Sequence, residues 1–239
     1  MKCLVCEGKY DLIFLQEYIE KYSKVQGYPV NNNMDDFFDI FRSDYHPFHE
    51  GYKCVIYGEG GKRKLFERVI IPCVQEVFGR KGFKHHFFVV ADADGADPDH
   101  LCSIYYKAIT ENIRSRKTTR YSCRRRNGDS CHVFYSPHDE RYQCIVKTAH
   151  LPTSLENELV LKGVDKFRGK ISKKTQENIL NMPIHDALRS LSAHVGLTVE
   201  DFIKQSVNEE WFIDEPWFTE INHGLSSFLG IELQGSERF

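Results

Sequence analysis

Two short apolar runs in this chain are each followed by acidic residues. The run that opens the chain precedes Glu7 and Asp11, and a second run, residues 87–91, leads into Asp92 and Asp94. If both runs are buried parallel strands, their carboxyl ends meet at the edge where open α/β sheets place their sites. Carboxylates gathered there repel one another and either share protons or hold a divalent cation such as Mg²⁺. The pattern predicts a metal site around which the chain is organised.

A third acidic segment follows a later strand-like run. Ser154 is expected to cap a helix that carries Glu156 near its start. As local structure, acids in a first helical turn simply favour the helix dipole. The position directly after a strand-like run also makes Glu156 a candidate member of the same acidic site.

The elements that position these acids alternate in type along the chain. Strands are predicted over residues 3–6, 53–57 and 87–92. Helices are predicted over 9–22, from the Gly-rich turn to residue 78 with a kink at Pro72, and from an N-cap at Asp97 and a first helical residue at Pro98 towards 114. This β-α-β-α-β-α order predicts a parallel sheet with right-handed crossovers. Residues 28–52 have no sustained period and are expected to form a long loop with a short helix near 35–41.

The turn Gly58-Glu-Gly-Gly-Lys62 joins the second strand to its helix. Its glycines permit a tight turn whose amides face an anion, but it lacks the Walker A spacing. Lys62 has two interpretations: a positive charge that stabilises a developing negative one, or a solvent-facing residue in the first helical turn.

Residues 114–126 contain basic residues and no acidic one, in a chain whose formal net charge is −2. Such runs are usually solvated loops, but the asymmetry favours contact with phosphates. Its candidate nucleic-acid-binding residues are Arg114, Arg116, Lys117, Arg120, Arg124, Arg125 and Arg126.

The eight cysteines are expected to be reduced thiols in a cytoplasmic protein, because neither a signal-peptide layout nor a membrane-length apolar run occurs. Cys3 and Cys6 should point to opposite faces of one strand. A structural zinc site is an alternative, but the spacing of the candidate ligands matches no standard zinc finger. Its candidate ligands are Cys123, Cys131, His132, His138 and Cys144.

The last part of the chain is helical in pattern. It resembles a helix-turn-helix in outline, but the would-be recognition helix after Thr198 lacks residues that read bases, so a packing module is expected. An aromatic terminal segment is expected to dock on the main domain or on a partner. Its large rings are Trp211, Phe212, Trp217, Phe218 and Phe228.

The acidic pattern resembles the Toprim domain, the catalytic module of topoisomerases, bacterial primases and the OLD-family (overcoming lysogenisation defect) nucleases. Glu7 in Glu-Gly-Lys-Tyr-Asp11 and the Asp92-Ala-Asp94 pair match the Toprim signature, and Ser154-Leu-Glu156 is similar to a later OLD-type element. The resemblance implies a Toprim-like Rossmannoid parallel sheet over residues 1–165, with insertions at about 28–52 and 114–130. A helical region over 166–239 follows.

The resemblance also implies roles for the acids. Glu7 would be metal-linked and a general base, Asp92 and Asp94 metal ligands, and Asp11 and Glu156 members of a second metal site. Two Mg²⁺ or Mn²⁺ ions roughly 4 Å apart would activate water and stabilise the leaving oxygen of a phosphodiester. Lys62 would assist catalysis.

The leading hypothesis is a metal-dependent endonuclease acting on DNA or RNA, with the effector of an antiviral-defence system as one such enzyme. No ATPase segment is found, so a separate ATPase chain and a second copy of this chain are candidate protein partners, and no membrane contact is expected. Two alternatives stay open: a non-catalytic nucleic-acid-binding or partner-binding protein on a Toprim fold, and a phosphotransfer enzyme or small-molecule phosphohydrolase on a related α/β sheet.

Overall fold

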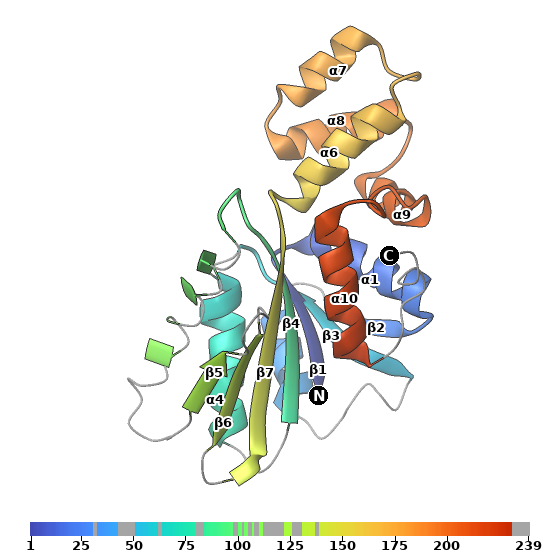
Figure 1. Cartoon of the computed structure of the whole chain (residues 1–239). Coiled ribbons are helices and arrows are strands. Elements are labelled where there is room, and N and C mark those ends of the chain that lie inside the picture. Colours follow the sequence, from blue (N-terminus) through green and yellow to red (C-terminus); the bar gives the residue numbers. More distant parts are fainter. Residues whose placement is uncertain are drawn as a thin grey trace.

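Seven strands pair into one sheet in the computed structural model of the chain. They are β1 (Lys2–Cys6), β2 (Gln26–Val30), β3 (Tyr52–Gly58), β4 (Lys84–Asp92), β5 (Ser122–Arg125), β6 (Cys131–Ser136) and β7 (Asp139–Leu151). Their spatial order is β2-β3-β1-β4-β7-β6-β5 (Figure 1). The first five strands in this order are parallel, and β6 and β5 continue the sheet antiparallel.

The structure describes most of the chain. The described residues are 1–30, 33–42, 51–61, 64–79, 84–97, 100–101, 103–104, 107, 110–111, 122–125, 131–136 and 139–230.

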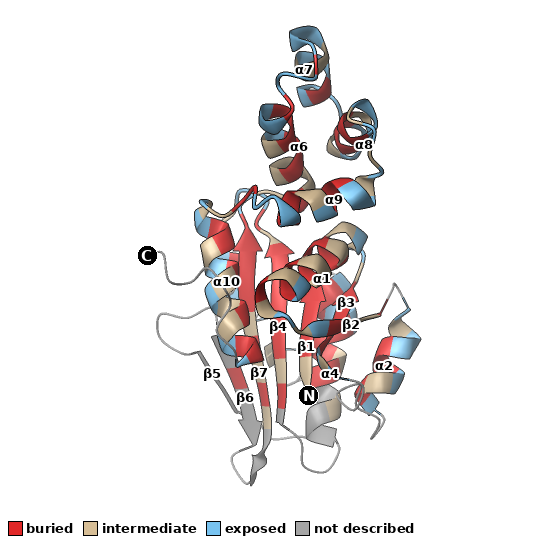
Figure 2. Cartoon of the chain, turned by 90° about the vertical axis from the view of Figure 1, so that its right-hand side faces the viewer, coloured by how far each residue is buried: buried red, intermediate tan, exposed pale blue. Residues whose placement is uncertain are grey.

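Helices cover both faces of the sheet. They are α1 (Lys9–Ser23), α2 (Met34–Arg42), the π-helix η2 (Leu65–Ile70), α4 (Ile71–Gly79), α6 (Leu155–Lys166), α7 (Lys173–Leu180), α8 (Ile184–His194), α9 (Val199–Asn208) and α10 (Pro216–Leu229). One face carries α1 and α10, and the other carries α2, η2 and α4 (Figure 2). The predicted class, an α/β protein with a parallel sheet flanked by helices, is confirmed.

The central strand β1 is buried on both faces. Leu4 and Cys6 lie in the core beneath α1 and α10, whereas Cys3 and Val5 lie in the core beneath η2 and α4. The predicted opposite orientation of the two cysteines is therefore confirmed, and both are free thiols. An apolar run without alternation is what a strand buried on both faces requires.

The long loop predicted over residues 28–52 is wrong at its start. Residues 26–30 form β2, which pairs in parallel with β3 at the edge of the sheet. Pro29 obscured this strand, yet an edge strand tolerates a proline because only one side of it bonds to a neighbour. The short helix expected near 35–41 is present as α2.

The helix predicted after the Gly-rich turn is interrupted near its expected kink. Residues 65–70 form the π-helix η2, and α4 begins at Ile71, directly before Pro72. Proline lacks the amide that would continue the ladder, so the wider π turn ends where the proline enters.

Three helices stand beyond the carboxyl ends of the parallel strands. Figure 1 shows that β7 leads into α6, that α7 and α8 lie beside α6, and that α10 returns along β7 and β4. The would-be recognition helix α9 packs on α1, and Lys9 Nζ lies 2.6 Å from Glu200 Oε1. In the part of the chain that the structure describes, no helix is both long and apolar enough to span a membrane.

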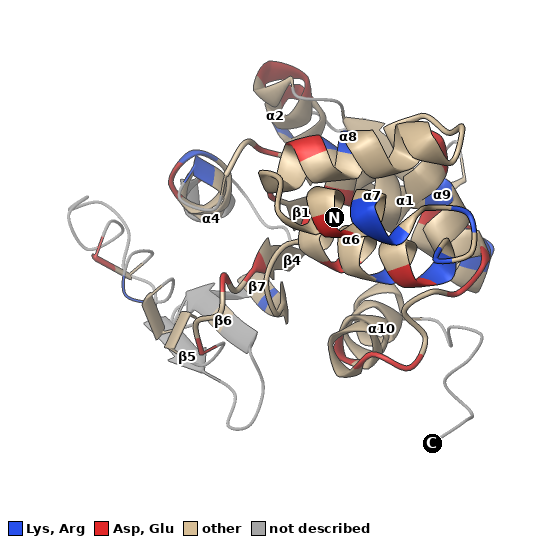
Figure 3. Ribbon diagram, turned by 90° about the horizontal axis from the view of Figure 1, so that it is seen from above, with Lys and Arg blue, Asp and Glu red and all other residues tan. Residues whose placement is uncertain are grey.

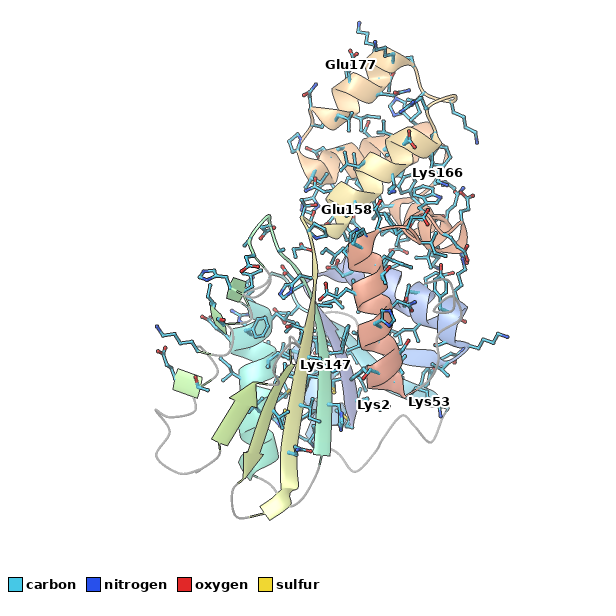
Figure 4. The ribbon with its side chains drawn as sticks, in the orientation of Figure 1. Lys2, Lys53, Lys147, Glu158, Lys166 and Glu177 are labelled. Carbon is cyan, nitrogen blue, oxygen red and sulfur yellow. The ribbon has the colours of Figure 1, made fainter. Side chains whose placement is uncertain are left out.

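The terminal aromatic segment docks on the sheet side of the molecule. The Phe228 ring lies 5.7 Å from that of Phe88 on β4, and the Phe212 ring lies 5.9 Å from that of Phe14 on α1. Lys2 Nζ donates to the Leu229 carbonyl at 2.6 Å and Lys147 Nζ donates to Ser227 Oγ at 3.1 Å, holding the end of α10 (Figure 4). One core cluster thus runs from the sheet into α6–α10. The domain boundary near residue 165 stays a prediction.

Candidate functional site: an acid cluster at the strand ends

The turn after β1 is held by hydrogen bonds from the turn that follows the neighbouring strand β3. The amides of Glu59 and Gly61 donate to the carbonyls of Cys6 and Glu7, each at 3.0 Å. A Cβ atom at Gly58 would lie 2.8 Å from the Gly8 carbonyl oxygen, so only glycine allows this approach. These two amides of the Gly-rich turn therefore fix the Glu7 backbone, whereas the sequence had suggested that they face an anion.

The loop after β4 is hydrogen-bonded to the segment that links β7 to α6. Asp92 is in register with Leu151, and the amides of Ala93 and Gly95 donate to the carbonyls of Leu151 and Pro152 at 2.7 and 2.9 Å. Asp94 is exposed and has a left-handed φ of 50°, which aspartate tolerates better than most residues. This pairing carries Asp92 towards the start of α6.

The first two acidic segments meet directly. The Asp92 amide donates to Glu7 Oε1 at 2.8 Å. This contact follows from register, because β1 and β4 are parallel neighbours in which Cys6 pairs with Val90, so the end of β4 reaches the turn that follows β1.

Asp11 is close enough to three other acidic residues to interact with them electrostatically. It occupies the first turn of α1 and is only 8% exposed. Burial, and then the negative charges of Asp92, Glu156 and Glu7, raise the pKa of its carboxyl well above the usual range. The four carboxylates Glu7, Asp11, Asp92 and Glu156 thus form one electrostatic group, which we call the acid cluster.

Glu156 enters the acid cluster from α6. Ser154 caps this helix as predicted, accepting from the Asn157 amide at 3.3 Å. The Glu156 side chain is 15% exposed, and its Oε1 lies 3.6 Å from Nδ1 of His185 in the first turn of α8. Sequence reasoning missed His185, because no motif surrounds it and only the packing of α8 on α6 brings it here.

The acid cluster offers the hard oxygen donors that Mg²⁺ and Mn²⁺ prefer. A bound cation would offset the repulsion between the negative charges of these carboxylates, which contributes to the raised pKa of Asp11. The donor set therefore fits a divalent cation in its chemistry. As the side chains lie, no three His, Cys, Asp or Glu residues in the described ranges form a metal-holding group. Binding would require the carboxylates to turn towards a shared point.

Several predicted site residues are not placed. Lys62, Arg114, Arg116, Lys117, Arg120, Arg126 and the candidate zinc ligand His138 lie outside the described residues. For Arg124 and Arg125 the structure gives the backbone position alone, in β5. Cys144, another candidate zinc ligand, is a buried free thiol.

Asp97 is a capping residue, as expected from the sequence. Its Oδ2 accepts from the His100 amide at 3.3 Å, and its carbonyl accepts from the Leu101 amide at 3.1 Å. It is an exposed carboxylate a few residues beyond the acid cluster.

Comparisons with models of protein families, with curated proteins and with solved structures found no match to this chain.

Proposed function

We propose that the acid cluster binds a divalent cation, Mg²⁺ or Mn²⁺, and that the protein is a Toprim-like phosphodiesterase that cleaves DNA or RNA. The observation that carries this proposal is the burial of Asp11 beside three further carboxylates. Such a cluster costs stability unless protons or a cation neutralise it. Its position at the carboxyl edge of a parallel sheet is where α/β enzymes hold their ligands.

The residues of the cluster are suited to different tasks. When bound, the cation would supply charge neutralisation at the phosphate and a more acidic water. Glu7 is half-buried and oriented by the Asp92 amide, so it is the proposed acceptor of the proton from the attacking water. Asp11 is buried and would hold the cation. Exposed Asp94 would meet the cation or substrate from the rim.

Cleavage of mixed DNA and RNA substrates tests the proposal. Wild-type protein is incubated with labelled duplex DNA, single-stranded DNA and RNA, with Mg²⁺ or Mn²⁺ and with EDTA. Metal-dependent cleavage is expected, together with a loss of at least about a hundredfold in Glu7→Gln, since one general base contributes 10²–10⁴-fold.

Asp97→Asn is the matched control, because it removes a carboxylate close to the cluster while keeping a good N-cap. This variant should retain wild-type cleavage. Equal cleavage by the wild type and Glu7→Gln, or cleavage that persists in EDTA, would overturn the assignment.

A non-catalytic nucleic-acid-binding protein of the same fold is the second candidate. It is favoured by one observation, namely that no metal-holding group of three side chains exists among the described residues as they lie. A Mg²⁺ titration separates the two candidates. Nucleic-acid binding without any metal response or cleavage would support the second.

Partners and location belong to the same proposal. A separate ATPase chain would supply the energy-dependent control of an antiviral effector, and a second copy of the chain could complete the assembly. A cytoplasmic location is supported by the free thiols of the five described, buried cysteines. Copurification with an ATPase chain tests the first partner, and the molecular mass of the protein in solution tests the second.

A further inference from the structure

A second basic segment lies in the described part of the chain, between α6 and α7. Five cationic residues fall within residues 166–174 and no acidic residue interrupts them. All five are exposed: Lys166, Arg168, Lys170, Lys173 and Lys174. We call this the 166–174 basic segment. In Figure 3 the basic colour appears on α7 and on the loops beside it.

Two of these side chains are already held in place. Arg168 Nη2 lies 2.8 Å from Asp165 Oδ1, and Lys170 Nζ lies 5.3 Å from the centre of the Phe167 ring. Phe167 itself is buried against Trp211 and Phe202. The segment therefore presents its charges from a well-packed base.

The 166–174 basic segment stands at a fixed distance from the acid cluster. Helix α6 begins with Glu156 in its first turn and ends at Lys166. Figure 4 shows Glu158 near the base of α6 and Lys166 at its other end. At 1.5 Å per residue, α6 separates Glu156 from Lys166 by ~15 Å, which spans about four to five nucleotide steps of a duplex.

We propose that the 166–174 basic segment binds the phosphodiester backbone of the nucleic acid, a few nucleotides away from the bond held at the acid cluster. Charge complementarity supports this ligand, because closely spaced lysines and arginines on an exposed surface neutralise consecutive phosphates. The inference rests on the proposed function for the choice of polymer. It adds a contact region separate from residues 114–126.

The test measures binding without cleavage. The double variant Lys173→Glu/Lys174→Glu is compared with Lys24→Glu/Lys53→Glu, which changes net charge equally at exposed lysines away from the segment. Labelled duplex DNA, single-stranded DNA and RNA are titrated in EDTA at several salt concentrations. The first variant should weaken binding at least about tenfold and reduce the salt slope on duplex DNA by about 1.8, the value for two lost phosphate contacts.

Two results would overturn the inference: equal affinities and salt slopes for both double variants, or no binding of any nucleic acid by the wild type. Circular dichroism confirms that the variants are folded. The assay omits the metal, so this inference and the proposed function fail separately. Cleavage lost in Glu7→Gln with binding retained would support the proposed function, whereas weaker binding by Lys173→Glu/Lys174→Glu alone would support this inference.

Discussion

At the residue scale, the acid cluster is defined by one buried carboxyl. The pKa of the Asp11 carboxyl is raised first by burial and second by the negative charges of Asp92, Glu156 and Glu7. The folded protein therefore holds the Asp11 proton more tightly than the unfolded chain does. The contribution of Asp11 to the free energy of unfolding is fully present below the pKa of aspartate in the unfolded chain, about 3.9. It is lost as the pH rises through the higher pKa of Asp11 in the folded protein.

Asp11→Asn removes this pH-dependent cost while keeping the shape of the side chain. Without divalent cation, the variant should melt about 2–4 °C above the wild type in neutral solution, equivalent to ~1 kcal/mol. The gain should shrink as the pH falls towards 4, where aspartate in the unfolded chain also takes up its proton. Melting curves across this pH range check the prediction, and a gain independent of pH would contradict it.

Gly58→Ala tests whether the close approach of the turn after β3 positions Glu7. The added methyl would lie 2.8 Å from the Gly8 carbonyl oxygen, so the β1–α1 turn must move. We expect the free energy of unfolding to fall by about 1–3 kcal/mol and cleavage to fall with it.

Gly60→Ala is the control for this prediction, since a Cβ atom there has no neighbour within 4 Å. Its effect should stay within about 0.5 kcal/mol. Urea denaturation measures the free energy of unfolding of both variants. An equal loss of stability in both would show that the approach of Gly58 to the Gly8 carbonyl is not the cause.

The acids that share a site were predictable because strand ends in a parallel sheet converge. Glu7, Asp11, Asp92 and Glu156 were all candidates from their positions after apolar runs, and the structure groups them. Their metal-binding roles remain predictions. His185 could not be found from the sequence, because its place beside Glu156 depends on helix packing between distant segments.

At the element scale, α10 depends on a glycine for its contact with the sheet. A Cβ atom at Gly224 would lie 2.4 Å from Cε2 of Phe88, so helix and ring touch only without a side chain. The sequence indicated that the terminal aromatics would dock, but it did not show that α10 returns to β4 and β7.

Gly224→Ala should therefore push α10 off Phe88. We expect a loss of about 1–3 kcal/mol in stability and faster exchange of the amide hydrogens of α10. Gly169→Ala, where a Cβ atom has no neighbour within 4 Å, is the control and should be neutral or slightly stabilising. Hydrogen exchange that stays unchanged in Gly224→Ala would contradict the packing described.

Secondary structure was predictable where periodicity was strong. Helices α1 and α2 were expected, as was a break near Pro72 after the second strand. Strand β2 was missed, because Pro29 and the asparagines beyond it dominate the local pattern. What makes residues 26–30 a strand is pairing with β3, a tertiary contact that local sequence does not encode.

At the scale of the whole molecule, the sheet and the C-terminal helices meet at the acid cluster. Glu7 and Asp92 come from strand ends, Asp11 from α1, and Glu156 from the first of the helices beyond the sheet. The cluster therefore exists only when both parts are packed together on their shared core. Neither the shared core nor the placement of α6–α8 was evident from composition.

The central claim is that this cluster holds a divalent cation, and calorimetric titration with Mg²⁺ and Mn²⁺ tests it most directly. Wild type, Asp92→Asn and the control Asp97→Asn are titrated in buffers of different ionisation enthalpy. We expect saturable binding with proton release from Asp11, unchanged in Asp97→Asn and at least about tenfold weaker in Asp92→Asn. Absence of binding in the wild type, or equal affinity in Asp92→Asn, would contradict the account.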